Sequence, residues 1–171
     1  MLLAMVGPIE TLIRSRVNLF GIHVYLKPSK NYIMSKITVT AFVTAPVQTA
    51  WSYYTLPEHI TNWNFASDDW QCPHASNDLR SGGVYSARME AKDGSFGFDF
   101  EGTYSVVELN KTMTYVLADG REVTTSFEEE NGITIVTTVF DAEIENPIAI
   151  QQAGWQAILD NYKSYCEKNN L

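Results

Sequence analysis

The chain has 171 residues, of which 45% are hydrophobic and 12% aromatic. This composition suits one globular domain with a sizeable core, and it excludes a collagen, a coiled coil or a wholly disordered chain. Lys and Arg number 12 and Asp and Glu number 20, giving a formal net charge of −8. That balance argues against a general nucleic-acid binder, because phosphate affinity depends mainly on clustered basic side chains. No stretch reaches the roughly 18 consecutive apolar residues of a membrane helix, so no membrane span is predicted.

The cysteine content points to a reducing environment. Cys72 and Cys166 are the two cysteines, too few for a disulfide framework and without the paired spacing of a structural zinc site. Residues 1–9 lack the leading positive charge of a secretory signal, and Glu10 interrupts the apolar run. We therefore expect a cytoplasmic protein with two free thiols.

The first residues differ in charge from the rest of the chain. Residues 1–33 carry four basic side chains and one acid, a net +3, which leaves −11 on the other 138 residues. They show no sustained helical or strand period, and Pro8, Gly21 and Pro28 break the long amphipathic helix of a targeting peptide. We expect residues 1–33 to form an N-terminal extension outside the fold and residues 34–171 to form the domain.

A strand and two short helices are predicted at the start of the domain. Residues 37–43 are β-branched and alternate, which is typical of a strand. Pro46 suits the first position of a helix, because Val47, Ala50, Trp51 and Tyr54 follow at helical spacing. A second short helix is expected near Pro57, and residues 62–78, rich in polar and aromatic side chains, are expected to form a loop.

Regularly spaced turn signals then predict an antiparallel meander. The pairs Gly82-Gly83, Asp93-Gly94, Asp119-Gly120 and Asn131-Gly132 can supply the positive φ angles of tight hairpins. Strand-like runs lie between and after them at residues 84–91, 96–109, 112–118, 122–129 and 133–142. In the longest run, alternation places Phe96, Phe98, Phe100, Gly102, Tyr104 and Val106 on one apolar face.

A long C-terminal helix can cover that apolar face. Asn146 is a good N-cap and Pro147 a good first helical residue. The stripe that follows recurs at three- and four-residue steps: Ile148, Gln151, Trp155, Ile158, Leu159, Tyr162 and Cys166. Gly154 inside this helix costs about 1 kcal/mol relative to alanine, which indicates close approach to the sheet or space left for a ligand. The element order predicts an α+β helix-grip fold, in which a curved antiparallel sheet wraps around the terminal helix.

Five segments carry a resemblance to a known family. They are PEHITNW at 57–63, DLRSGG at 78–83, RMEAKDG at 88–94, FDFEGTY at 98–104 and QAGWQAILDN at 152–161. In this order they resemble the activator of heat-shock-protein-90 ATPase homologues, a family of the SRPBCC (START-like) superfamily, over residues 36–168. The resemblance implies a single START-like domain with a cavity between helix and sheet. It implies little about chemistry, and we do not expect the additional N-terminal domain of the family's namesake cochaperone in this chain.

The aromatic residues are the best candidates for lining such a cavity. Taken singly, each of these residues is as typical of a packed core as of a binding site. Together they form the predicted ligand-binding set. This set is Trp63, Phe65, Trp70, Met89, Phe98, Phe100, Tyr104, Phe127 and Trp155.

The sequence predicts no metal site and no catalytic residues. His59, His74 and Cys72 have no recognised ligand spacing, although Asp68 and Asp69 lie close by in the chain. No Gly-x-Ser-x-Gly elbow and no phosphate-binding glycine loop followed by a helix occur. Asp99 and Glu101 alternate with Phe98 and Phe100, which places the two carboxylates on the solvated face. No cofactor is expected.

Two arginines could instead hold an anionic group of a ligand. A guanidinium in an apolar cavity can bind a carboxylate or phosphate through two parallel hydrogen bonds. For Arg80 and Arg88, surface ion pairing is the favoured interpretation, since arginine is mostly exposed in folded proteins.

Two functions of different classes remain open. The favoured one is non-catalytic binding of a small hydrophobic or amphipathic molecule between the sheet and the last helix. The alternative is a module that contacts a chaperone through its acidic surface, which salt-sensitive binding would indicate. A third hypothesis is a cyclase or hydrolase. The wider superfamily contains such enzymes, but this sequence shows no set of catalytic residues.

Removal of residues 1–33 is expected to leave the domain intact, because this segment has the opposite charge balance and no periodic apolar face. A chain beginning at Met34 should have nearly the same melting temperature as the full chain. Thermal unfolding followed by circular dichroism tests this, and a much lower melting temperature or insolubility of the shorter chain would contradict it.

Overall fold

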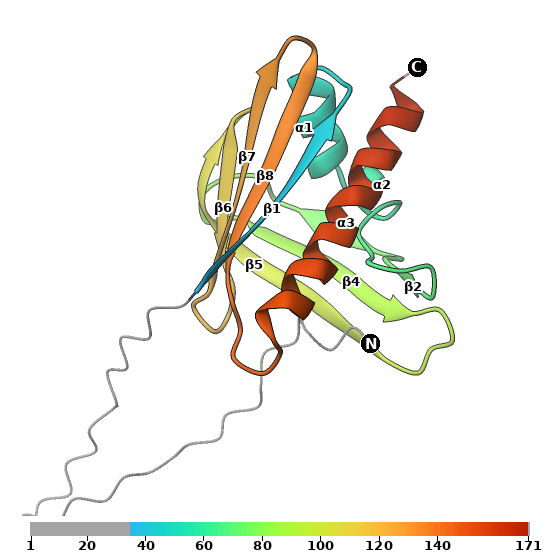
Figure 1. Cartoon of the computed structure of the whole chain (residues 1–171). Helices are drawn as coiled ribbons and strands as arrows, with labels where there is room; N and C mark the ends of the chain where they lie inside the picture. Colours follow the sequence, from blue (N-terminus) through green and yellow to red (C-terminus); the bar gives the residue numbers. More distant parts are fainter. Residues whose placement is uncertain (1–34, 171) are drawn as a thin grey trace, which may run out of the picture.

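The computed structural model describes residues 35–170, so the expected extension at residues 1–33 lies outside the described residues (Figure 1). The described chain contains a strand, two short helices, seven more strands and a long helix. The elements are β1 Lys36–Val43, α1 Val47–Thr55, α2 Pro57–Ile60, β2 Trp70–Gln71, β3 Ala75–Asn77, β4 Val84–Ala91, β5 Gly97–Glu108, β6 Thr112–Val116, β7 Glu122–Glu130, β8 Ile133–Asp141 and α3 Ile148–Asn169.

The strands form one curled antiparallel sheet. Its order is β1-β8-β7-β6-β5-β4-β2, with β3 also pairing with β4. In Figure 1 this sheet curls around α3, which lies across its concave side. Helix α1 packs against β7, β8 and α3. The predicted helix-grip fold is confirmed.

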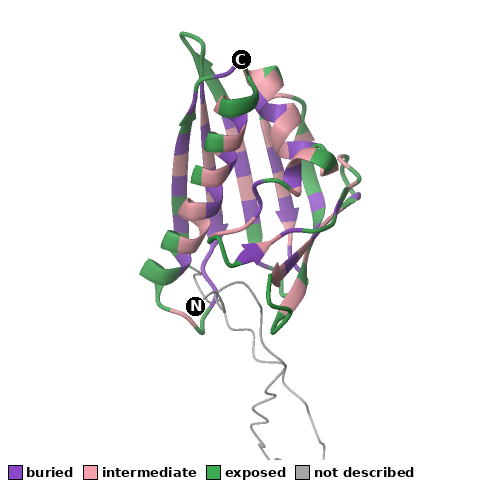
Figure 2. Ribbon diagram, turned by 90° about the vertical axis from the view of Figure 1, so that its right-hand side faces the viewer, coloured by how far each residue is buried: buried purple, intermediate pink, exposed green. Residues whose placement is uncertain are grey.

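The core lies between the concave face of the sheet and α3. In β1 the buried residues Ile37, Val39, Ala41 and Val43 alternate with more exposed ones, as the β-branched pattern predicted. Figure 2 shows the same alternation along the neighbouring strands. On α3, Tyr162 is fully buried, and its hydroxyl donates a 2.6 Å hydrogen bond to the carbonyl oxygen of Ala50 in α1. This bond joins the long helix to the first one.

The prolines stand one position earlier in the helices than predicted. Pro46 and Pro147 are N-cap residues, and neither α1 nor α3 has a side-chain cap hydrogen bond. Both prolines combine φ near −60° with extended ψ, 149° for Pro46 and 139° for Pro147, which places them just outside the helices. Asn146 is therefore not the N-cap of α3, contrary to the sequence prediction.

Residues 62–78 are not entirely loop, contrary to prediction. Trp70 and Gln71 form β2, which pairs with Ala91 and Glu90 of β4. Residues 75–77 form β3, which pairs with residues 85–87 of the same strand. These strands are too short to show a period, and they exist because the edge of β4 offers them unpaired backbone groups.

A β-bulge changes which face the end of β5 presents. The register of β5 against β6 shifts between Tyr104 and Val106, which inserts one extra residue. As a result Val106 is 41% exposed, whereas Val107 packs against the core. Simple alternation had placed Val106 on the apolar face, and that prediction is wrong. Phe96, predicted on the same face, precedes β5 and is 42% exposed.

The predicted Asn131-Gly132 turn is confirmed. Asn131 and Gly132, between β7 and β8, have φ angles of 53° and 79°, as the tight hairpin requires. Cys72 and Cys166 are buried and free. Among residues 35–170, no helix combines the length and the apolar character needed to cross a membrane.

Two glycines provide a matched test of packing. A Cβ atom at Gly102 would lie 2.5 Å from Cδ2 of Tyr115, whereas one at Gly154 would meet nothing within 4 Å. The second observation rules out close approach to the sheet as the reason for Gly154. We expect Gly102→Ala to lower the free energy of unfolding by about 1–3 kcal/mol through overpacking. Gly154→Ala should raise it by about 1 kcal/mol through helix propensity.

Urea unfolding of the two variants measures both effects. A Gly102→Ala variant as stable as the unmodified chain would contradict the packing of Tyr115 on Gly102.

Candidate functional site

A cavity lies between the sheet and α3. The space open to the centre of a water-sized sphere is about 40 Å³, which corresponds to only a few water molecules. Its lining is mainly aromatic and aliphatic, with contributions from α1, α3 and five strands. The lining residues are Val39, Tyr54, Trp63, Asn64, Tyr85, Met89, Phe100, Tyr104, Met113, Tyr115, Thr138, Trp155, Ile158 and Leu159.

Trp155 is the main contribution of α3 to this cavity. Its ring stacks on Phe140 of β8, with centroids 4.2 Å apart and planes 18° apart. It also meets Phe100 of β5 edge-on, at a centroid distance of 6.0 Å. Both Trp155 and Phe100 are half-buried, unlike most of the lining. Tyr54 and Tyr85 of the lining are half-buried as well.

Tyrosines make the opposite wall. Tyr85 stacks with Tyr115 at 5.7 Å, and Tyr104 meets Tyr115 edge-on at 5.9 Å. Asn64 donates a 3.0 Å hydrogen bond from Nδ2 to the hydroxyl oxygen of Tyr85. The hydroxyl of Tyr115 makes no hydrogen bond within the described residues. The wall thus offers hydroxyl groups to a ligand within an apolar surface.

These hydroxyls stay neutral. Burial raises the pKa of Tyr85 and Tyr115 well above the ordinary value, and neighbouring tyrosines add to the effect. Burial likewise raises the pKa of Tyr54 and Tyr104. Neutral phenols donate and accept hydrogen bonds but do not act as general bases at neutral pH.

Five of the nine predicted pocket residues line the cavity. Met89, Phe100 and Tyr104 come from β4 and β5, Trp63 from the segment after α2, and Trp155 from α3. The indole N–H of Trp63 donates to the carbonyl oxygen of Tyr53 at 2.9 Å, which fixes that ring. Whether these five bind a ligand remains a prediction.

The other four predicted residues lie away from the cavity lining. Phe127 is buried against Trp51 and Tyr54. Trp70 and Phe98 contact each other at a centroid distance of 6.2 Å. Phe65 is half-buried and packs on the core. In these positions they act as packing, and they take no part in the lining.

Sequence reasoning missed much of the lining, above all Tyr54, Tyr85 and Tyr115. Tyr85 follows the same alternation as the buried Ala87 and Met89, so its inward position could have been found. Met113 and Tyr115 are buried at alternate positions of β6, so the inward position of Tyr115 could also have been found from alternation.

The acidic and basic residues considered as candidates for catalysis or anion binding lie outside the cavity lining. Asp99 and Glu101 are exposed, as alternation predicted. Arg80 forms an ion pair with Asp78 at 2.7 Å, and Arg88 pairs with Glu90 at 3.2 Å, so both arginines serve surface pairing as expected.

The histidine and cysteine candidates do not converge. His59 is half-buried, and its Nδ1 lies 2.8 Å from the Tyr165 hydroxyl, which joins α2 to α3. Burial raises the pKa of the Cys72 and Cys166 thiols to about 11, which makes both poor nucleophiles at neutral pH. No group of three His, Cys, Asp or Glu side chains suited to a metal ion occurs within residues 35–170.

Comparison with known families gives a match over most of the domain. The sequence model of the family described as "Activator of Hsp90 ATPase homolog 1-like protein" matches residues 44–167. The chain belongs to this family. The resemblance found in the five sequence segments is therefore confirmed. Curated proteins gave no match.

Solved structures of bacterial proteins agree with this assignment. An AHSA1-like protein from Aeromonas hydrophila is 44% identical, with a TM-score of 0.74, covering 78% of this chain and 93% of its own. A protein from Cytophaga hutchinsonii is 45% identical, with a TM-score of 0.69 and the same coverages of 78% and 93%. A protein from Nitrosomonas europaea shares the fold at 16% identity, with a TM-score of 0.65, covering 78% of this chain and 94% of its own.

The buried tyrosines predict a loss of stability in alkali. The pKa of Tyr85 and Tyr115 is raised in the folded state, whereas in the unfolded chain it is about 10. Above that pH the unfolded state loses phenolic protons that the folded state retains. The stabilisation is fully present below pH about 10 and falls by up to about 1.4 kcal/mol per pH unit for each such tyrosine.

Urea unfolding at a series of pH values between 9 and 12, with tyrosine absorbance followed at 295 nm, measures this loss. Tyr115→Phe removes one of these phenols and should make the decline less steep. An identical decline in that variant would contradict the role of Tyr115.

Proposed function

We propose that this protein binds a small hydrophobic or amphipathic molecule in the cavity between the sheet and α3, without catalysing a reaction on it. The observation that carries the proposal is the aromatic lining itself. Ligand sites are concave and mostly apolar, with a few placed polar groups, and here the tyrosine hydroxyls and Asn64 supply such groups. A cytoplasmic location, which the cysteine usage indicates, is part of this proposal.

The small volume sets a condition on binding. A cavity of about 40 Å³ holds a few water molecules, so any larger ligand must displace part of the wall. Trp155 and Phe100 are two of the half-buried rings in the lining, and their centroids lie 6.0 Å apart. We propose that these two rings turn aside when the ligand enters, whereas the fully buried Met89 and Met113 stay in place.

The family description supports a second candidate. A module that contacts a chaperone would use the exposed acidic side chains of a chain with net charge −8. Such contacts between exposed charges weaken as salt screens them. Salt-sensitive chaperone binding that is independent of small molecules would favour this candidate over a ligand-binding protein.

Binding of N-phenyl-1-naphthylamine, a neutral fluorescent probe, tests the ligand-binding proposal. We expect saturable fluorescence enhancement with the unmodified protein. Trp155→Phe should weaken binding about fivefold, because part of the apolar contact is lost. Trp70→Phe is the matched control, since Trp70 lies outside the cavity lining, and it should leave the affinity unchanged.

Stability is measured in parallel by thermal unfolding, because Trp155 also packs on Phe140. A lower affinity in Trp155→Phe with little change in melting temperature supports binding at the cavity. Absence of saturable binding to the unmodified protein, or equal losses in both variants, would contradict it.

A further inference from the structure

Arg121 is a buried basic residue that neither the predicted site nor the cavity lining includes. Its relative exposure is 8%, although arginine is seldom buried without a partner. It directly precedes β7, in which Val123, Thr125 and Phe127 are buried at alternate positions. Continuing that alternation places Arg121 on the same concave face.

The strand register fixes what lies beside it. Val123 pairs with Tyr115 on one side and with Phe140 on the other. The backbone N–H of Leu117 donates to the carbonyl oxygen of Arg121 at 2.9 Å, which extends the ladder by one row. Arg121 therefore lies one row beyond Tyr115, which lines the cavity, and beyond Phe140, on which Trp155 stacks.

Only part of the guanidinium is used within the protein. Nε donates a 2.7 Å hydrogen bond to Oδ2 of Asp119, and Oδ1 of the same carboxylate accepts from the Arg121 backbone N–H at 3.1 Å. The two terminal nitrogens form no hydrogen bond or ion pair with residues 35–170. They carry four N–H donors, and both nitrogens keep some contact with solvent, so a ligand can reach them.

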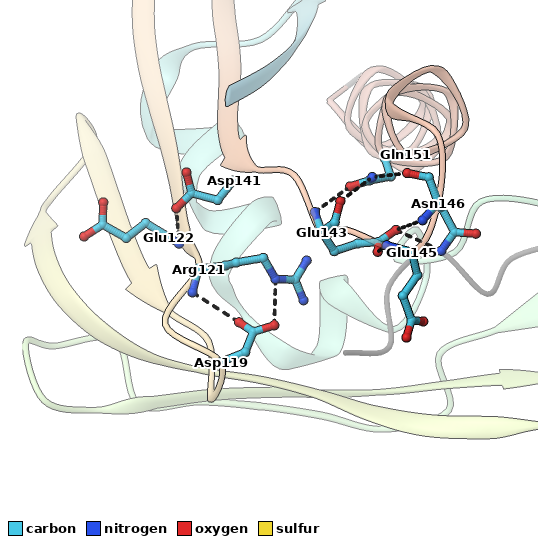
Figure 3. A network of polar contacts seen from close by, with 8 residues as sticks. All are labelled: Asp119, Arg121, Glu122, Asp141, Glu143, Glu145, Asn146 and Gln151. Carbon is cyan, nitrogen blue, oxygen red and sulfur yellow. Dashed lines mark hydrogen bonds and ion pairs between the residues drawn. The ribbon is translucent and has the colours of Figure 1, made fainter. Parts of the chain in front are cut away.

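The nearby acids do not take these donors. In Figure 3 the Arg121 side chain extends toward the segment that leads into α3, and no contact joins it to Glu143 or Glu145. The carboxylate of Glu143 is held by the backbone N–H groups of Glu145 and Asn146 and by Nδ2 of Asn146. Three of the roughly four acceptor positions of this carboxylate are therefore used, and the terminal guanidinium nitrogens have no partner among residues 35–170.

We propose that Arg121 binds the carboxylate of an amphipathic ligand whose apolar part occupies the cavity. The two terminal nitrogens present parallel N–H donors that match the two oxygens of one carboxylate. This inference rests on the proposed function, and it adds the chemical class of the ligand: an apolar body with one acidic end.

A comparison of an acid with its amide tests the inference. 1-Naphthylacetate and 1-naphthylacetamide have the same ring and nearly the same shape, and they differ in the charge of the polar end. Each is used to displace N-phenyl-1-naphthylamine from the full chain at pH 7. We expect the acid to bind about tenfold more tightly than the amide, because charge-assisted bidentate hydrogen bonds are stronger than neutral ones.

Substitution of the arginine assigns the preference to a residue. Arg121→Met should abolish the difference between acid and amide while leaving the neutral probe bound. Arg80→Met is a matched control, because Arg80 likewise pairs with the aspartate two positions earlier, at 2.7 Å, but its side chain is 68% exposed. It removes the same charge and should retain the tenfold preference. Arg121→Lys keeps the charge without the planar fork and should retain only part of it.

The outcomes separate the two proposals. Equal affinity of acid and amide for the unmodified protein would overturn the role of Arg121, and it would leave the cavity as a site for neutral ligands. A preference that persists in Arg121→Met would overturn it as well. The first comparison needs no variant, so it decides the question even where Arg121→Met does not fold. Failure of the neutral probe to bind the unmodified protein would overturn both proposals.

Discussion

The packing of α3 on the concave face of the sheet is the interaction on which the rest of this structure depends. A sheet curled in one direction presents a dry inner surface that must be covered, and α3 covers it. Trp155 stacks on Phe140 near one end of the contact, and the Tyr162 hydroxyl bonds to Ala50 near the other. The same contact that completes the core also forms one wall of the cavity, so site and core share one surface.

This shared surface explains why the candidate site is small. It also explains why the wall formed by the strands is more rigid than the wall formed by α3. Met89 and Met113 are fully buried within the sheet, whereas Trp155 and Phe100 are half-buried. The wall formed by the strands is held by ladder hydrogen bonds, and the wall formed by α3 is held by side-chain contacts. A ligand would therefore enter by displacing side chains, because separating strands would break many hydrogen bonds at once.

Polar groups are concentrated where α3 begins. Gln151 is 1% exposed, and its Oε1 accepts from the backbone N–H of Glu143 while its Nε2 donates to the carbonyl oxygens of Glu143 and Asn146. These bonds fix the turn between β8 and α3, because each buried polar atom has found a partner. Arg121, near this turn, differs, since its terminal nitrogens have no partner among residues 35–170 and keep some contact with solvent.

The sequence alone determined the fold class, the family and most element positions. The alternation in β1 and the Asn131-Gly132 turn are local signals. Each can be recognised from a few neighbouring residues, without knowledge of the tertiary contacts. Of the five predicted ligand-binding residues that line the cavity, four lie on regular alternation or helical spacing, and Trp63 does not. The caps at Pro46 and Pro147 were misplaced by one residue, because ψ at a proline is not fixed by its ring.

Only the tertiary structure decided which aromatic side chains share a cavity. Phe127 and Phe100 are equally plausible from sequence, yet Phe127 packs on Trp51 whereas Phe100 faces Trp155. The bulge after Tyr104 and the pairing of β3 with β4 likewise became visible only when the strands were paired. Local sequence encodes periodicity and turn chemistry, but the neighbours of a side chain in a curled sheet are set by register, which depends on contacts between distant segments.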